Sequence, residues 1–340
     1  NEGRPQRNVP LTKTRSHTYK RRSSTMKILR NLLAALAAFA LTLAHAEQIS
    51  VTHWGVQLYG LPFAVAMEKG YFKEGGVDID GILTSKGGGT TVRNVLASGL
   101  PYGEVALSAA VAAANEGIEI RIVNDGVVSV GDLLWVTTLD NPVKTIQDLQ
   151  GRKMGYSAPK SVTDIVSRLC LEAAHIPLDK VQRVAVGGIG SQLTALKDGG
   201  ISAAFMSEPV WSKVKKDYRA VFYVSQVLPS DKITQTVGIV TAEFAKAHPD
   251  QVKAIVQGRK KGVEFIYAHP KEAADILAKA YKQDPKIMEE AVANMVKIRY
   301  WSAGEFDLDG MKRMVDGMRQ VGALDKPFDV TKLIDERFLK

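Results

Sequence analysis

The sequence contains a single cysteine, Cys170, among its 340 residues. One thiol cannot form a disulfide within the chain, and it cannot build a thiolate metal cluster. Its position on the apolar face of an expected helix is typical of an inert core thiol. The sequence therefore excludes a fold that depends on internal disulfides or on cysteine-bound metal.

Most of the chain also lacks an excess of positive charge, although its formal net charge is +9. Residues 1–46 contain nine Lys and Arg side chains and one acidic side chain. Residues 47–340 contain 36 Lys and Arg against 35 Asp and Glu, so their net charge is close to +1. This balance provides no basic surface for a phosphate backbone, and we therefore expect no nucleic-acid partner.

Patterns for metal and cofactor binding are missing as well. The histidines at 53, 175, 248 and 269 do not pair as H-x-H or H-x-x-x-H. No phosphate-binding Gly-Lys-Ser/Thr spacing occurs, and the glycines at 187–190 lack the rest of a dinucleotide fingerprint. The sequence therefore predicts no metal, no cofactor and no catalytic residue, and so a protein that is not an enzyme.

Residues 26–46 have the pattern of an export signal. A short basic start is followed by an apolar run at 32–43 and then by Ala44-His45-Ala46. This combination is typical of a Sec signal peptide, whereas a membrane-spanning helix needs about 20 apolar residues. We therefore expect residues 1–25 to be a disordered basic extension, cleavage after Ala46, and a periplasmic mature protein.

Strand and helix signals alternate along the rest of the chain, which is typical of an α/β fold with mainly parallel sheets. Two similar sets of strands and helices are followed by a helical C-terminal segment. The extended stretches 133–138 and 234–240 are predicted to cross between two lobes on a hinge, with a ligand in the cleft between them. The expected C-terminal helices are Pro249–Ala268, Pro270–Lys282, Pro285–Ile298 and Leu308–Val321.

Two junctions between a loop and a helix carry the strongest chemical signal. Residues 84–91 read Thr-Ser-Lys-Gly-Gly-Gly-Thr-Thr, and residues 157–163 read Ser-Ala-Pro-Lys-Ser-Val-Thr. Glycines let the backbone approach a ligand, and a helix N-terminus offers unpaired N–H donors and the positive end of its dipole. Each junction also contains a lysine, Lys86 or Lys160. One such turn alone is more simply a helix cap, but two in matching places predict an anion-binding cleft.

Two further groups of polar and aromatic residues follow predicted strands. Trp54 and Tyr59 are candidates for the apolar wall of a ligand site and Gln57 for a hydrogen bond to the ligand, although Tyr59 is equally consistent with packing on its own lobe. Glu208 is a candidate for binding an amine or for fixing the second lobe. The alternative is a helix start, with Ser207 as N-cap and a proline at the first helical position.

The order and spacing of several segments resemble the substrate-binding proteins of nitrate, sulfonate and taurine importers, which are related to the domain named after thiamine-pyrimidine synthesis. The resemblance covers nearly all of residues 48–340. Its carriers are residues 61–74 (LPFAVAMEKGYFKE), 87–91 (GGGTT), 146–155 (IQDLQGRKMG), the helix after Ser161, 203–209 (AAFMSEP) and 328–335 (FDVTKLID).

The resemblance implies a periplasmic binding-protein fold of type II, with two α/β lobes and a ligand cleft between them. Lobe 1 is expected to comprise residues 47–136 and 237–340, and lobe 2 residues 137–236. The ligand contacts implied by matching positions are Trp54, Gln57, Gly88, Gly89, Thr90, Ser108, Ser161, Val162, Thr163, Ser207 and Glu208. The residue arguments above add Tyr59, Ser85 and Lys160, and Lys160 favours an anionic ligand because relatives often have small residues at that position.

The resemblance further implies the solute-binding component of an ABC importer. Such a protein would act as a monomer that captures a small anion, such as a sulfonate, a nitrate-like ion or a carboxylate, and would pass it to a membrane permease. Three alternatives remain open on this fold: an enzyme of thiamine-pyrimidine synthesis, a pyrimidine-binding receptor, and a receptor that signals to a membrane kinase. The signal peptide and the lone cysteine argue against the enzyme.

Overall fold

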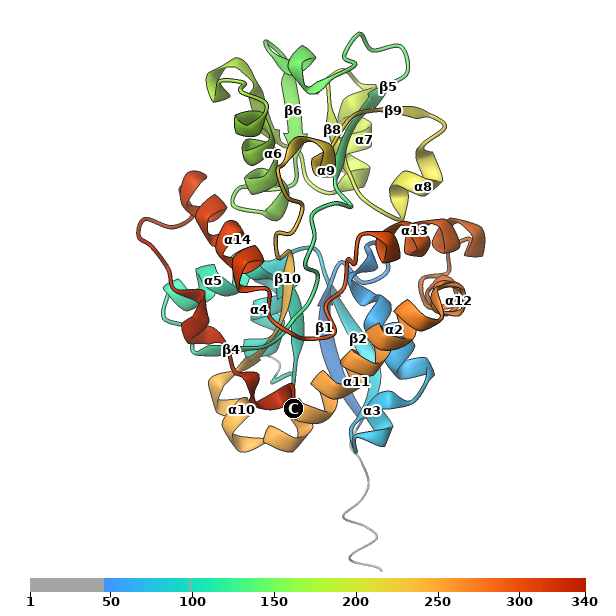
Figure 1. Ribbon diagram of the computed structural model, residues 1–340, viewed down its shortest axis with the longest axis vertical. Coiled ribbons are helices and arrows are strands. Elements are labelled where there is room, and N and C mark those ends of the chain that lie inside the picture. The colour runs from blue at the N-terminus through green and yellow to red at the C-terminus, as the bar shows by residue number, and fades with distance from the viewer. Residues whose placement is uncertain (1–45, 98) are drawn as a thin grey trace, which may run out of the picture. The chain divides into compact units, whose positions relative to one another are not determined.

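The computed structural model describes residues 46–97 and 99–340, so the predicted basic extension and nearly all of the predicted signal peptide lie outside the described residues. The described chain is built around two groups of strands (Figure 1). We call residues 46–125 and 236–340 the first lobe, residues 134–223 the second lobe, and residues 126–133 and 224–235 the two crossings. None of the helices in this part of the chain combines the length and the apolar character needed to span a membrane.

The first lobe contains a five-stranded sheet in the order β2-β1-β3-β10-β4. Strand β1 pairs in parallel with β2 and β3, whereas β10 runs antiparallel to β3 and β4. The strands are β1 (Ala46–Thr52), β2 (Asp78–Ser85), β3 (Gly103–Ala106), β4 (Ile120–Asp125) and β10 (Thr236–Thr241).

Helices cover this sheet, and the long α11 packs against α2 and α3 (Figure 1). The helices of the first lobe are η1 (Leu58–Gly60), α2 (Leu61–Glu68), α3 (Tyr71–Glu74), α4 (Gly88–Ala97), α5 (Leu107–Asn115), α10 (Ala242–Ala247), α11 (Pro249–Ala268), α12 (Pro270–Tyr281), α13 (Pro285–Lys297), α14 (Leu308–Gln320), η4 (Val330–Leu333) and η5 (Glu336–Phe338). The four C-terminal helices thus agree with the sequence-based bounds to within one residue.

The second lobe contains an antiparallel group in the order β8-β5-β9 and the parallel pair β6-β7. A parallel bridge between Met154 and Ala203 joins the two groups. The strands are β5 (Leu134–Thr138), β6 (Lys153–Tyr156), β7 (Gln182–Ala185), β8 (Ala204–Met206) and β9 (Tyr218–Tyr223). The helices are η2 (Ile146–Leu149), α6 (Val162–Ala173), η3 (Leu178–Lys180), α7 (Ile189–Lys197) and α8 (Val210–Val214).

The two crossings lie side by side and are joined by hydrogen bonds. The N–H of Val130 donates to the carbonyl of Asp231 over 2.8 Å, and Ser129 Oγ donates to the Asp231 carboxylate over 2.7 Å. Gln235 Nε2 donates to the Ser129 carbonyl and to the Asp132 carboxylate, each over 2.6 Å. The second crossing also contains the short helix α9 (Val224–Val227). The crossings are therefore a paired ribbon rather than two independent linkers.

The crossings do not lie where the sequence predicts them. Residues 133–138 form most of β5, and residues 234–240 form most of β10, so both stretches are strands of a sheet. Extended, β-branched residues serve equally well in a strand and in a linker, and only the pairing partner distinguishes the two. The expected boundaries between the lobes fall inside these two strands. The boundary at 136/137 lies within β5, and the boundary at 236/237 lies after the first residue of β10. The division into two lobes itself stays a prediction.

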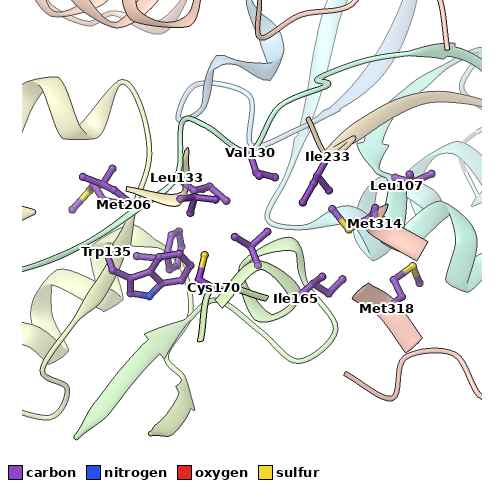
Figure 2. Close-up of a cluster of buried hydrophobic side chains, with 14 of the residues drawn as sticks. Leu107, Val130, Leu133, Trp135, Ile165, Cys170, Met206, Ile233, Met314 and Met318 are labelled. Atoms are coloured by element: carbon purple, nitrogen blue, oxygen red, sulfur yellow. The ribbon is translucent and has the colours of Figure 1, made fainter. Parts of the chain in front are cut away.

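Apolar side chains form two buried clusters. One lies within the first lobe, around α2, α11 and α12. The other continues from the second lobe past the crossings to α5 and α14 of the first lobe (Figure 2). The residues labelled in that view include Trp135, Cys170, Ile165, Met314 and Leu107. An apolar core therefore runs from one lobe into the other.

Candidate functional site

The loops that follow β1, β2 and β3 leave the first sheet at one edge, because these strands are parallel. Trp54 and Gln57 follow β1, and Ser85 is the last residue of β2. Residues 88–90 begin α4, while Ser108 lies in the first turn of α5. The structure thus brings these first-lobe candidates to one edge.

A row of hydroxyl groups holds the turn between β2 and α4. Ser85 Oγ donates to the carbonyl of Gly87 over 3.1 Å and lies 2.6 Å from Thr91 Oγ1. Thr91 Oγ1 in turn lies 2.6 Å from Thr52 Oγ1 at the end of β1. Ser85 and Thr91 are buried. The Ser85 hydroxyl therefore stabilises the turn through hydrogen bonds within the protein, whereas the prediction was a contact with ligand.

The start of α4 presents two unpaired backbone donors. The N–H groups of Thr90 and Thr91 donate to the Gly87 carbonyl. Within the described residues, the N–H groups of Gly88 and Gly89 have no acceptor, and the first turn of α4 holds no acidic residue. Unpaired N–H groups at the positive end of a helix attract anions.

Arg93 adds a full charge to this turn. Its guanidinium donates to Thr90 Oγ1 over 2.9 Å, and its Nη1 lies 3.7 Å from the position that a Cβ on Gly89 would occupy. Lys86, in the same loop, is exposed. Sequence reasoning missed Arg93, although its spacing of three residues from Thr90 places both on one side of a helix.

Gly88 is required by packing. A Cβ at this position would lie 2.6 Å from the Cβ of Ala109 on α5, closer than real side chains approach. At Gly89, by contrast, a Cβ would meet nothing nearer than the Arg93 side chain. The glycine at 88 therefore lets α4 begin directly against α5, and this contact fixes the direction of the free N–H groups.

The loop after β1 is anchored on α12. The Trp54 ring meets the Tyr281 ring edge-on, with centroids 5.1 Å apart, and the Tyr281 hydroxyl donates to the Gln57 carbonyl over 2.8 Å. Trp54 is half-buried. The side-chain oxygen of Gln57 is buried and has no hydrogen-bond partner among the described residues. Both side chains thus keep capacity for a further contact.

Tyr59 is placed differently. It is buried, and its hydroxyl donates over 2.8 Å to Gln235 on the second crossing. Gln235 also binds Asp132, which accepts from Tyr300 as well, and burial raises the pKa of the Asp132 carboxyl to about 7. This arrangement supports packing, rather than ligand contact, for Tyr59. The network connects the loop after β1 to both crossings, and no pattern in the sequence indicated it.

In the second lobe, three hydroxyl groups close the turn between β6 and α6. Ser157 Oγ lies 2.9 Å from Ser161 Oγ and 2.7 Å from Thr163 Oγ1. Ser161 is the N-cap of α6, as predicted, and its hydroxyl accepts from the N–H of Asp164. Within the described residues, the N–H groups of Val162 and Thr163 have no acceptor. The matching turns thus each offer two free donors.

The α6 turn already contains an anion of its own. Asp164, in the first turn, is buried, and its carboxylate accepts from the N–H of Lys160 over 2.7 Å. The same carboxylate pairs with Arg183 of β7, which also lies over the Tyr156 ring. Asp164 therefore balances the positive helix end. Lys160 itself has a φ of 66° and an exposed side chain, so nothing holds its ammonium over the turn.

Glu208 and Ser207 follow β8 and are both buried. The Glu208 carboxylate accepts from the N–H and the hydroxyl of Ser212 and from Asn294 Nδ2 of α13, over 3.0–3.1 Å. Asn294 belongs to the first lobe, so Glu208 links the lobes, and neighbouring Lys215 forms an ion pair with Glu290 of α13.

The prediction that Ser207 caps a helix with Pro209 at its first position is wrong. Helix α8 begins at Val210, Pro209 occupies the N-cap position, and the Glu208 carboxylate accepts from the N–H and the hydroxyl of Ser212 within the helix. The Ser207 hydroxyl is buried and has no hydrogen-bond partner among the described residues. Propensity favours serine as a cap, but here the longer glutamate reaches those donors.

Among the described residues, no group of three or more His, Cys, Asp or Glu side chains is arranged to hold a metal ion. Cys170 is buried, and desolvation raises the pKa of its thiol, so it is not poised to act as a nucleophile. A hollow of about 400 Å³ is lined by α6, α14 and the second crossing rather than by the predicted contacts. Whether the α4 and α6 turns meet on one ligand stays a prediction.

The family model described as "NMT1/THI5 like" matches residues 57–273, which include both the α4 turn and the α6 turn. The chain belongs to the NMT1/THI5-like family. A similar relative is the "Putative aliphatic sulfonates-binding protein" of Bacillus subtilis (strain 168), which is 23% identical over 301 residues, covering 86% of this chain and 88% of the relative.

Solved structures share the fold of this NMT1/THI5-like chain. The periplasmic aliphatic sulphonate binding protein SsuA from Escherichia coli matches with a TM-score of 0.69 and 12% identity, covering 86% of this chain and 92% of that one. The desulfurization enzyme DszB matches with a TM-score of 0.62 and 14% identity, covering 86% and 97%. The α/β fold of periplasmic binding proteins is thus confirmed, and the same fold also occurs in an enzyme.

Proposed function

We propose that this protein is the solute-binding component of an ABC importer, and that it captures a small anionic ligand through closure of its two lobes. The observation that carries the proposal is the start of α4, where two N–H groups without a partner among the described residues, the helix dipole and Arg93 all favour negative charge at one point. Lys86, in the same loop, adds to the positive potential.

The α6 turn is expected to complete the site from the second lobe. It offers two N–H groups and three hydroxyl groups, while the pairing of Asp164 with Arg183 keeps it neutral. Closure needs a ligand that binds the closed form better than the open form, and contacts from both lobes supply that difference. The proposed order is docking on the α4 turn first and closure of the α6 turn afterwards.

A sulfonate is the first ligand to test. The relatives in Bacillus subtilis and Escherichia coli are named for binding aliphatic sulfonates, and a sulfonate presents three acceptor oxygens to the N–H donors. Trp54, half-buried beside the α4 turn, would pack against an alkyl chain. A nitrate-like ion or a carboxylate offers the same charge with fewer oxygens or a different shape.

An enzyme on this fold is the second candidate, because DszB shares the fold. The buried Cys170, whose thiol has a raised pKa, is the only cysteine of the chain and is a poor nucleophile. The buried thiol therefore argues against an enzyme with a cysteine nucleophile, and we favour a binding protein. It also implies a periplasmic location after export and a permease as membrane partner.

Calorimetric titration with butanesulfonate, nitrate and butyrate tests the proposal. We expect butanesulfonate to bind with a Kd of about 1 μM or below, and butanol, which has the chain without the charge, to give no heat. The proposal fails if no sulfonate, nitrate or carboxylate either produces heat or raises the thermal midpoint. Turnover of a sulfinate or sulfonate, detected by mass spectrometry, would favour the enzyme instead.

A further inference from the structure

Helix α14 packs against both lobes. It contacts α5 of the first lobe and α6 of the second lobe. Its buried face consists largely of three methionines, Met311, Met314 and Met318, which belong to the cluster that continues into the second lobe (Figure 2). Methionine side chains are unbranched and adapt to changes in their surroundings more easily than branched ones. This interface is therefore suited to small rotations that keep its apolar surface buried.

Helix α14 approaches α6 closely at Gly317. A Cβ on Gly317 would lie 2.4 Å from Cγ2 of Ile165, so no larger residue fits without moving one of the helices. Ile165 is fully buried and lies one turn from the start of α6. The two helices therefore rest on each other at this point.

Leu169, one turn further along α6, also approaches α14, because its Cδ1 would lie 3.5 Å from a Cβ on Gly317. A cavity of about 400 Å³ opens there, walled on the α6 side by Leu169, Glu172 and Ala173. Its other walls are Arg313, Asp316, Gly317 and Gln320 of α14, and Leu228, Pro229, Ser230 and Ile233 of the second crossing. The hollow is open to solvent, because Glu172, Arg313 and Asp316 on its walls are exposed. The space lies between the lobes and next to a segment that connects them.

Ile165 lies between the N-terminal turn of α6 and the part of α6 that lines the cavity. The turn of Ser161 and Thr163 is on its N-terminal side, and the cavity wall at Leu169 and Ala173 is on its C-terminal side. A rotation of the second lobe about an axis that crosses α6 at the contact between Ile165 and Gly317 would move these two ends in opposite directions. If the turn approaches the first lobe, the cavity wall must move away from α14.

We propose that α14 is the bearing on which the second lobe turns, and that lobe closure widens the cavity between α6 and α14. The bearing concerns the lobes themselves and does not depend on which ligand binds. Residues that fill the cavity then favour the closed form, and residues that enlarge it let the cavity collapse and favour the open form. Cavity residues thus tune ligand affinity without touching the ligand, because they change the population of the closed form.

Two substitutions of opposite sign test the bearing. Ala173→Leu adds volume to the cavity from a partly exposed helical position, and Leu169→Ala removes volume. We expect butanesulfonate to bind about threefold or more tightly to Ala173→Leu and at least about threefold more weakly to Leu169→Ala. Ala280→Leu, the same change at an exposed position of α12, is the matched control and should leave the Kd unchanged.

A second measurement needs no ligand. Spin labels on Leu96→Cys of α4 and Ser191→Cys of α7 report the distance between the lobes, since both residues are exposed and Cys170 is buried. Without ligand, the distance should shorten with Ala173→Leu and lengthen with Leu169→Ala. Equal distances in all variants, or a shift of the same sign in both, would overturn the bearing. If Leu169→Ala does not fold, Leu169→Val takes its place.

The two proposals fail in different ways. If the unaltered protein does not bind butanesulfonate or any other anion tested, the proposed function is wrong, while the distances without ligand still decide on the bearing. If the protein binds butanesulfonate and neither cavity variant changes the Kd or the distance, the function stands and the bearing is wrong.

Discussion

The α4 turn and the α6 turn look alike in sequence but differ in charge. Both follow a parallel strand, both contain serine and threonine hydroxyls, and both leave two N–H groups without acceptors in the described part of the chain. The α4 turn has no acidic residue and has Arg93 beside it. The α6 turn has a buried Asp164 paired with Arg183.

This difference indicates that the two lobes contribute differently to ligand binding. A helix N-terminus attracts an anion only while its own side chains leave the positive potential uncompensated. The α4 turn meets that condition and has Arg93 in addition, whereas the charges of Asp164 and Arg183 offset each other at the α6 turn. We therefore expect the first lobe to supply most of the charge-dependent affinity, and the second lobe to supply hydrogen bonds that depend on closure.

The largest effect is expected from distorting the α4 turn. Gly88→Val places side-chain atoms where a Cβ alone already lies 2.6 Å from Ala109, so the start of α4 must move. Overpacking of this kind costs about 1–3 kcal/mol, and we expect butanesulfonate affinity to fall by about 100-fold. Calorimetry measures the affinity, and the thermal midpoint measures the stability.

Gly89→Ala is the matched control for this change. A Cβ at position 89 has no close neighbour, so both affinity and stability should stay near those of the unaltered protein. A full loss of affinity in the control, or none in Gly88→Val, would show that the α4 turn does not hold the ligand.

A gain of affinity is expected from removing the charge at the α6 turn. Asp164→Asn leaves Arg183 uncompensated and exposes the positive helix end, which is worth about 0.3–1 kcal/mol and so about two- to fivefold in the Kd. The thermal midpoint should fall, because a buried ion pair is lost. Titration of the variant with butanesulfonate at two salt concentrations measures the effect, which should shrink at high salt.

Unchanged or weaker binding of butanesulfonate by Asp164→Asn would mean that the charge of the second lobe does not act on the ligand. Arg183→Gln provides the opposite test, because it leaves Asp164 unpaired. That variant should bind the anion more weakly than the unaltered protein.

The smallest effect is expected from Ser161→Ala. The change removes the side-chain acceptor of the Asp164 N–H and should cost about 1 kcal/mol of stability. Because the N–H groups of Val162 and Thr163 remain, affinity should fall by no more than about threefold. Chemical denaturation and calorimetry on the same sample separate the two effects. A loss of affinity as large as that of Gly88→Val would show that the turns contribute equally.

Local patterns in the sequence determined much of this protein. The four C-terminal helices were predicted within one residue, because proline at the first turn and apolar residues at helical spacing act within one segment. The α/β class, the cap at Ser161 and the two loop–helix turns follow from equally local rules. The sequence also predicted correctly that Cys170 lies in a core, because the apolar face of a helix packs against other apolar side chains.

Only the tertiary structure decided which partner each polar or extended segment meets. It made strands of two stretches that read as crossings, and it placed Pro209 at the N-cap of α8, with Glu208 rather than Ser207 accepting from a helix N–H. It also paired Asp164 with Arg183 and set Gly317 against Ile165. These contacts join residues distant in the chain, and their energy depends on positions that no local pattern contains. The type of a residue shows which hydrogen bonds or charges it can offer to a ligand. The fold determines whether a partner within the protein already occupies them.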